Sequence, residues 1–247
     1  MGEETDEEVV PRPERRRRRR SREFLDAAQH IIALEGFEGL TMARLARELD
    51  TVDSAVYRYF PSKGALIAEI QKESIERLEA SLTAITAIGE ALYTSLGLDE
   101  RSAAVTRLVL FGRWFCTCTE TYPEEIRLLQ MIMSQRETAL DPEGGLRILP
   151  IAMQLVAHAI AAVESAKATG AVTEGESIDR AIIWSSALSG VLQTDDLERY
   201  APDLFGGTRL ARQASLDLLQ GWGADAKLLA AASELVDELS ADGPLAP

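Results

Sequence analysis

The sequence predicts an all-helical protein with a small N-terminal three-helix domain, arranged as a helix-turn-helix, and a larger C-terminal helical domain. Apolar residues recur at intervals of three and four along almost the whole chain, and no segment shows the two-residue alternation of a β-strand. The helices expected near the N-terminus are short, whereas the later ones are long. With 46% hydrophobic residues among 247, the chain can bury one large core or two smaller ones.

The N-terminal helices are delimited by residues that favour helix ends. A helix carrying Phe24 and Ile31 on its apolar stripe is expected to stop at Gly36, because glycine accepts the left-handed backbone of a helix end. Thr41 then caps a second short helix, and a polar turn at residues 50–52 leads into a third, Asp53–Tyr59. Residues 1–20 hold acids, prolines and arginines with almost nothing apolar, so we expect this leader to be disordered.

The remaining segments read as long helices separated by glycine and proline. The expected spans are Lys63–Ile88, Asp99–Glu120, Pro123–Glu137, Leu146–Ala168, Ser177–Arg199, Thr208–Trp222 and Ala224–Leu239. We therefore divide the chain into the leader at residues 1–20, a helix-turn-helix domain at residues 21–66 and a larger helical domain at residues 67–247.

Charge is distributed unevenly along the chain, whose net charge is −14. Residues 12–63 hold 12 Lys and Arg against 8 Asp and Glu, whereas residues 64–247 hold 14 against 27. A polyanion would therefore meet the N-terminal portion. No uninterrupted apolar stretch of roughly 20 residues and no signal-peptide core is visible, so we expect a cytoplasmic protein.

Metal, redox and catalytic chemistry find little support in the sequence. Cys116 and Cys118 lie two residues apart on an expected helix, so they cannot form a disulfide with each other. His30 and His158 are the only histidines, and neither has partners at metal-ligand spacing. No catalytic constellation is visible. We expect no cofactor, no metal and no enzymatic activity.

Residues 24–66 resemble the DNA-binding domain of the TetR family of bacterial transcriptional regulators. The resemblance is carried by Ala27-Ala28, Glu35-Gly36-Phe37, Thr41, Leu45-Ala46, Val56-Tyr57, Tyr59-Phe60, Ser62-Lys63 and Leu66. It implies a third helix that lies in the major groove of operator DNA. The sequence departs from the family in the turn, where Asp50-Thr51-Val52 replaces the common Gly-Val-Ser.

The resemblance and the helix pattern together indicate a DNA-binding surface. Its candidate residues are Thr41, Arg44, Asp53, Ser54, Ala55, Tyr57, Tyr59 and Lys63, with Lys63 as a phosphate clamp. Asp53 either contacts a cytosine amino group or only caps its own helix. The run Arg15–Arg20 is either a minor-groove arm or, the interpretation we favour, a solvated tail.

For the larger domain, the resemblance implies a pocket between the central helices and a dimer interface. The candidate pocket residues are Phe111, Trp114, Phe115, Cys118, Tyr122, Met131, Met133 and His158, although such a stripe is also typical of plain core. The candidate interface residues are Ile183, Ala187, Gly190, Val191, Leu210, Ala214 and Leu218. The expected function is a homodimeric repressor released from its operator by a small, largely apolar effector. The alternative is an architectural or co-regulatory DNA-binding protein without such a ligand.

Overall fold

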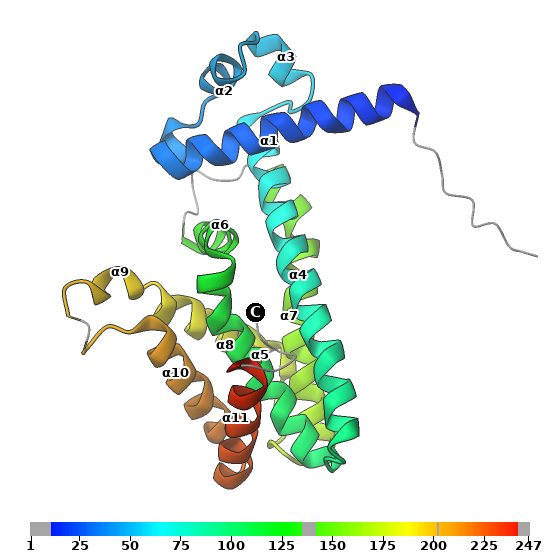
Figure 1. Ribbon diagram of the computed structural model, residues 1–247, viewed down its shortest axis with the longest axis vertical. Coiled ribbons are helices and arrows are strands. Elements are labelled where there is room, and N and C mark those ends of the chain that lie inside the picture. Colours follow the sequence, from blue (N-terminus) through cyan, green and yellow to red (C-terminus); the bar gives the residue numbers. More distant parts are fainter. Residues whose placement is uncertain (1–10, 135–141, 202, 242–247) are drawn as a thin grey trace, which may run out of the picture. The chain divides into compact units, whose positions relative to one another are not determined.

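The computed structural model describes residues 11–134, 142–201 and 203–241, and these are helical throughout with no strand (Figure 1). The helices are α1 (Arg12–Gly39), α2 (Met42–Glu48), α3 (Asp53–Tyr57), α4 (Lys63–Ser95), α5 (Glu100–Thr121), α6 (Pro123–Ser134), α7 (Pro142–Ala168), α8 (Ser177–Leu192), α9 (Asp195–Glu198), α10 (Gly207–Gly221) and α11 (Ala226–Ala241). They form two compact units, Met1–Lys72 with Gln135–Arg147, and Glu73–Ser134 with Ile148–Pro247. The all-helical fold predicted from the sequence is confirmed.

Helix α1 begins at Arg12, which corrects the expectation of a leader disordered as far as residue 20. A proline in the first turn fits a helix start, because its missing N–H would have no partner there. Arginine is a good helix former, and ion pairs one turn apart join Arg18 to Glu14 at 2.6 Å and Arg22 to Asp26 at 3.3 Å. The remainder of the leader, residues 1–10, lies outside the described residues.

The first unit has a small core under its helix-turn-helix. Gly36 interrupts α1 with φ 71°, as its position at a helix stop predicts. The core contains Phe24, Ile31, Leu45, Val56 and Leu66, each fully buried. Within it, the Phe24 ring lies 5.3 Å from that of Tyr59 and 6.4 Å from that of Phe60.

The turn between α2 and α3 is built without glycine. Asp50 adopts φ 45°, and it is the only described residue other than glycine with positive φ. The N–H of Thr51 donates to the carbonyl of Ala46 at 2.9 Å, and the N–H of Asp50 donates to that of Arg47 at 3.3 Å. This pair of hydrogen bonds is a Schellman motif. Aspartate tolerates the left-handed backbone better than most residues, so the turn ends α2 as a glycine would.

The second unit is organised around α5, which packs against α8, α10 and α11. Trp184 of α8 is fully buried, with its ring 4.7 Å from that of Phe111. Its indole N–H donates to Ser215 Oγ of α10 at 3.0 Å. Gly112 of α5 is also buried and lies beside both residues. Because a larger side chain would collide there, glycine lets α5 approach α8 and α10 closely.

Several helix boundaries differ from those expected. Helix α4 continues past Ile88 to Ser95 and ends before Gly97, which has φ 65°. The expected helix Ser177–Arg199 is instead two helices, α8 and the four-residue α9. Helix α6 ends at Ser134, whereas the expected helix was Pro123–Glu137, whose residues 135–137 lie outside the described range. Helix α7 begins at Pro142, four residues before the start of the expected helix Leu146–Ala168.

One segment of α7, Leu149–Ala168, is long and apolar enough to cross a membrane by length and composition alone. This differs from the expectation that no stretch approaches that length. Gln154 and His158 interrupt its apolar run. The helical core of a globular domain passes the same test, so the finding is weak evidence for a membrane span.

Candidate DNA-binding surface and ligand cavity

Helix α3 presents a polar outer face. Asp53, Ser54 and Tyr57 are exposed and Ala55 is half-buried, while Val56 is fully buried and fixes the helix to the core. The N-terminal cap of α3 is Val52, which makes no side-chain capping hydrogen bond. Asp53 lies in the first turn and does not cap the helix, so the capping alternative is wrong. Its carboxylate is open to solvent on the face expected to meet DNA.

Two of the cations expected at the DNA-binding surface, Arg44 and Lys63, already have partners within the first unit. Arg44 donates to Glu48 Oε2 at 2.6 Å and to Glu35 Oε1 at 2.9 Å. The hydrogen bond from Arg44 keeps the pKa of Glu48 below its usual value. Lys63 Nζ donates to the carbonyl oxygen of Phe37 at 2.7 Å. Arg44 therefore joins α1 to α2, and Lys63 secures the start of α4.

The other expected DNA-binding residues take different positions. The Thr41 hydroxyl accepts from the N–H of Arg44 at 3.0 Å, which confirms it as the cap of α2. Tyr59 is half-buried because its ring packs on Phe24. Sequence reasoning missed Arg58, which is exposed directly after α3 with its guanidinium 5.5 Å from the Tyr59 ring centre. Its sequence signal is a positive charge within the expected third helix, Asp53–Tyr59.

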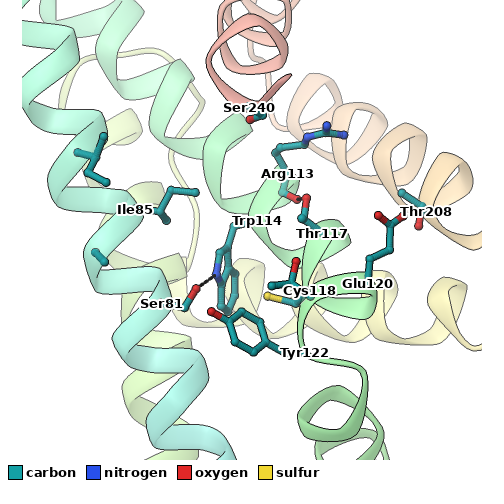
Figure 2. Close-up of a pocket in the computed structure, with 13 residues that line it drawn as sticks. Ser81, Ile85, Arg113, Trp114, Thr117, Cys118, Glu120, Tyr122, Thr208 and Ser240 are labelled. Carbon is teal, nitrogen blue, oxygen red and sulfur yellow. Dashed lines mark hydrogen bonds between the residues drawn. The ribbon is translucent and has the colours of Figure 1, made fainter. Parts of the chain in front are cut away.

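The second unit contains a cavity of about 430 Å³ between α4, α5, α10 and α11 (Figure 2). Three of the expected pocket residues, Trp114, Cys118 and Tyr122, line it. Figure 2 shows the Trp114 indole directed at Ser81, to whose Oγ it donates at 3.2 Å. The lining also includes Ala84, Ile85, Ile88, Arg113, Thr117, Glu120, Thr121, Thr208 and Ser240. Apolar and polar groups therefore share the wall.

A second cavity of about 240 Å³ lies between α4, α5 and α7. Phe111 and His158 line this cavity rather than the first, so the expected pocket residues are divided between two spaces. Tyr93 also lines it, and the buried hydroxyl of Tyr93 has no hydrogen-bond partner among the described residues. Burial raises the pKa of this phenol. Beside it, Arg107 holds Glu90 through two hydrogen bonds of 2.5 and 2.6 Å.

Three expected pocket residues remain, Phe115, Met131 and Met133. Phe115 lines neither cavity and packs against Phe111 and Trp114 at 6.3 and 6.2 Å between ring centres. The side chains of Met131 and Met133 lie outside the described residues. Burial raises the pKa of the Cys118 thiol and so disfavours its reactive thiolate form. In the described part of the chain, no group of three or more His, Cys, Asp or Glu side chains could hold a metal ion.

The neighbouring helices α8 and α10 carry the expected interface residues, and none of the seven is fully buried. Ile183 is 54% exposed, and Ile178 and Ile182 beside it are 45% and 47% exposed. Ala187, Ala214 and Leu218 line a shallow open groove. A Cβ at Gly190 would meet nothing within 4 Å. This face is apolar and has no partner within the described chain.

The fold and these sites define a two-unit helix-turn-helix protein, with a short recognition-type helix in one unit and a cavity-bearing helical core in the other. Residues 24–70 match the family described as bacterial regulatory proteins, tetR family. A solved tetR-family regulatory protein from Rhodococcus RHA1 has the same fold, with a TM-score of 0.60 and 19% identity over 83% of this chain and 97% of that one. Residues 24–70 therefore match the tetR family, and the chain shares the fold of a solved regulatory protein of that family.

Two curated relatives show higher identity over shorter stretches of the chain. The nucleoid occlusion factor SlmA of Haemophilus influenzae is 32% identical over 118 residues, covering 42% of this chain and 54% of that protein. The repressor DrrR1 of Streptomyces coeruleorubidus is 42% identical over 53 residues, covering 22% of this chain and 19% of that protein. The chain thus spans about half the length, or less, of these two curated relatives.

Proposed function

We propose that this protein is a transcriptional repressor that binds operator DNA as a homodimer and is released by a small, largely apolar effector. The observation that carries the proposal is that an exposed helix-turn-helix face and a cavity of about 430 Å³ occur in one chain. Helix α4 begins at Lys63, directly after the helix-turn-helix, and later supplies Ser81 and Ile85 to the cavity wall.

The exposed face of α3 supports sequence-specific reading. In the major groove, a carboxylate suits the cytosine amino group, so Asp53 would select C·G pairs. Ser54 would bond a neighbouring base edge, and Tyr57 would contact the sugar-phosphate backbone. One such helix reads only a few base pairs. A two-fold dimer joined through α8 and α10 would read two half-sites about 34 to 36 Å apart.

The cavity supports an effector that is apolar over most of its surface. Trp114, Ile85 and Ile88 would contact its apolar part, and Arg113 with Glu120 would bond any polar end. Binding and release are linked. If the effector weakens DNA binding by some factor, typically about 5 to 150-fold, DNA must weaken effector binding by the same factor. This function requires no cofactor or catalytic group, and it places the protein in the cytoplasm.

Selection of bound sequences from random DNA, with and without the small metabolites of a cell extract, tests the proposal. We expect a palindromic consensus that is lost when an effector is present. Ala84 lines the cavity, whereas Ala87, also exposed on α4, lines neither cavity. Ala84→Phe should therefore abolish the effector response and keep DNA binding, while Ala87→Phe should behave like the parent protein. If both variants responded like the parent, the cavity would not be the effector site.

The second candidate is an architectural DNA-binding protein, which the similarity to a nucleoid occlusion factor favours. Such a protein would bind recurring sites along a chromosome, and no metabolite would alter its affinity. Chromatin immunoprecipitation distinguishes the two functions. A few promoter sites support the repressor, whereas many dispersed sites with no effector response support the architectural protein.

A further inference from the structure

Four arginines of α1 line one hollow together with Arg58. Arg16, Arg17, Arg19 and Arg20 line an open hollow of about 800 Å³ together with Arg58, Tyr59, Pro13 and Glu23. We call these five arginines the arginine hollow. It holds five guanidinium groups against one carboxylate. Figure 1 shows the arginine-rich end of α1 extending past α3.

Part of this charge is available for a ligand. Glu23 accepts from Arg20 at 2.6 Å and lies 3.7 Å from Arg19. Among the described residues, Arg16 and Arg17 have no ion-pair partner, and both are exposed. Arg20 is held in place over the Phe24 ring at 4.9 Å. The hollow is therefore a partly fixed, strongly positive surface.

The rest of the helix-turn-helix unit offers few such cations. Arg44 is occupied by Glu35 and Glu48, and Lys63 donates to a backbone carbonyl. Electrostatic attraction to phosphates provides essentially all non-specific DNA affinity, and it must come from some set of cations. Among the described residues of this unit, the arginine hollow is the densest group of positively charged side chains.

We propose that the arginine hollow binds the DNA phosphate backbone beside the bases that α3 reads. The inference rests on the proposed DNA binding and adds to it a contact site on α1. Arg58 follows α3 directly, so a duplex lying on α3 passes near the hollow. The rise from Arg16 to Arg20 is about 6 Å, which corresponds to about two phosphates of one strand. Guanidinium groups bind phosphate oxygens in pairs of hydrogen bonds.

The composition of the hollow favours DNA over a lipid surface. Membrane-binding helices combine basic residues with an apolar face that enters the bilayer. Residues 12–20 contain only arginine, glutamate and one proline, so they offer no such face. An anionic membrane is therefore the alternative partner that the experiment must distinguish.

A matched pair of variants tests the proposal in the full-length chain. Arg16→Gln with Arg17→Gln removes two positive charges from the hollow, whereas Arg15→Gln with Arg18→Gln removes two from outside it. Gln has nearly the helix propensity of Arg, and circular dichroism confirms that both variants fold. Fluorescence anisotropy then measures binding to a labelled duplex of mixed sequence at about 50 to 200 mM KCl, the range over which phosphate contacts lose affinity steeply.

The expected difference lies in the dependence of affinity on salt. Loss of two phosphate contacts should make the negative slope of log affinity against log salt shallower by about two, so the parent's advantage over this variant should shrink roughly tenfold across that range. The variant at Arg15 and Arg18 should keep the parent's slope. Equal slopes for the two variants would overturn the proposal and support a solvated tail.

Two further outcomes separate this inference from the proposed function. If vesicles containing phosphatidylserine bind the hollow and the duplex does not, the proposal is wrong and a membrane is the partner. If selection finds no preferred sequence but the slopes still differ, sequence-specific repression fails while the hollow remains a phosphate-binding site.

Discussion

The contact between Gly112, Trp184 and Ser215 predicts that one substitution has opposite effects in two backgrounds. A Cβ at Gly112 would collide with Ser215 Oγ, while Ser215 Cβ and Trp184 Cζ2 would each lie 3.4 Å away. In Gly112→Ala, Ser215 must therefore turn its hydroxyl away and break its hydrogen bond with Trp184. A buried indole N–H without a partner costs about 1 to 3 kcal/mol. The helix gains about 1 kcal/mol because alanine replaces glycine.

Gly112→Ala should thus destabilise the parent by up to about 2 kcal/mol. In Ser215→Ala the hydrogen bond is already lost and the obstructing oxygen is absent, so Gly112→Ala should stabilise that variant by about 1 kcal/mol. Urea denaturation followed by circular dichroism measures both effects, at one protein concentration because association shifts apparent stability. If Gly112→Ala had the same effect in both backgrounds, within the roughly 0.3 to 0.5 kcal/mol typical of additivity, the reasoning would be refuted.

Two other predictions concern local turns. Because Asp50 holds a left-handed backbone, Asp50→Val should lower the free energy of unfolding by about 1 to 2 kcal/mol. Asp50→Asn should change it little, because asparagine also tolerates this backbone. Equal losses of the two variants in urea denaturation would contradict this prediction. Asp99 caps α5, and its hydrogen bond from the Ser102 hydroxyl lowers its pKa. A lowered pKa gives stability that is present above the unfolded value, near 4, and is lost as pH falls through the folded value. The melting temperature of the parent should therefore fall more steeply than that of Asp99→Asn as pH drops below about 4, and parallel profiles would count against the cap.

The helix-turn-helix could be predicted well from the sequence because its boundaries depend on local chemistry. Gly36 and Thr41 mark a helix stop and a cap that need only neighbouring residues. The partners of Arg44 and Lys63 could not be predicted. Glu35 lies nine residues from Arg44, and Phe37 lies 26 residues from Lys63, so the folded unit alone brings them together. The helical arginine segment was missed because its composition is also typical of disorder.

The cavities could be predicted only in part. An apolar stripe indicates which side of α5 is buried, and Trp114, Cys118 and Phe111 are indeed buried. The stripe does not reveal that two separate cavities lie along α5, because that depends on which helices flank each part of it. Trp114 therefore lines the cavity of about 430 Å³, whereas Phe111 lines the cavity of about 240 Å³.

The exposed isoleucines of α8 also bear on how the protein responds to its own abundance. A lone chain keeps Ile178, Ile182 and Ile183 in water, whereas the homodimer proposed above would cover them. Association that removes these side chains from water stabilises the folded chain by mass action. Dilution would then weaken folding and dimer formation together. The rates at which a cell synthesises and degrades this protein would then set the fraction of chains that are folded and dimeric.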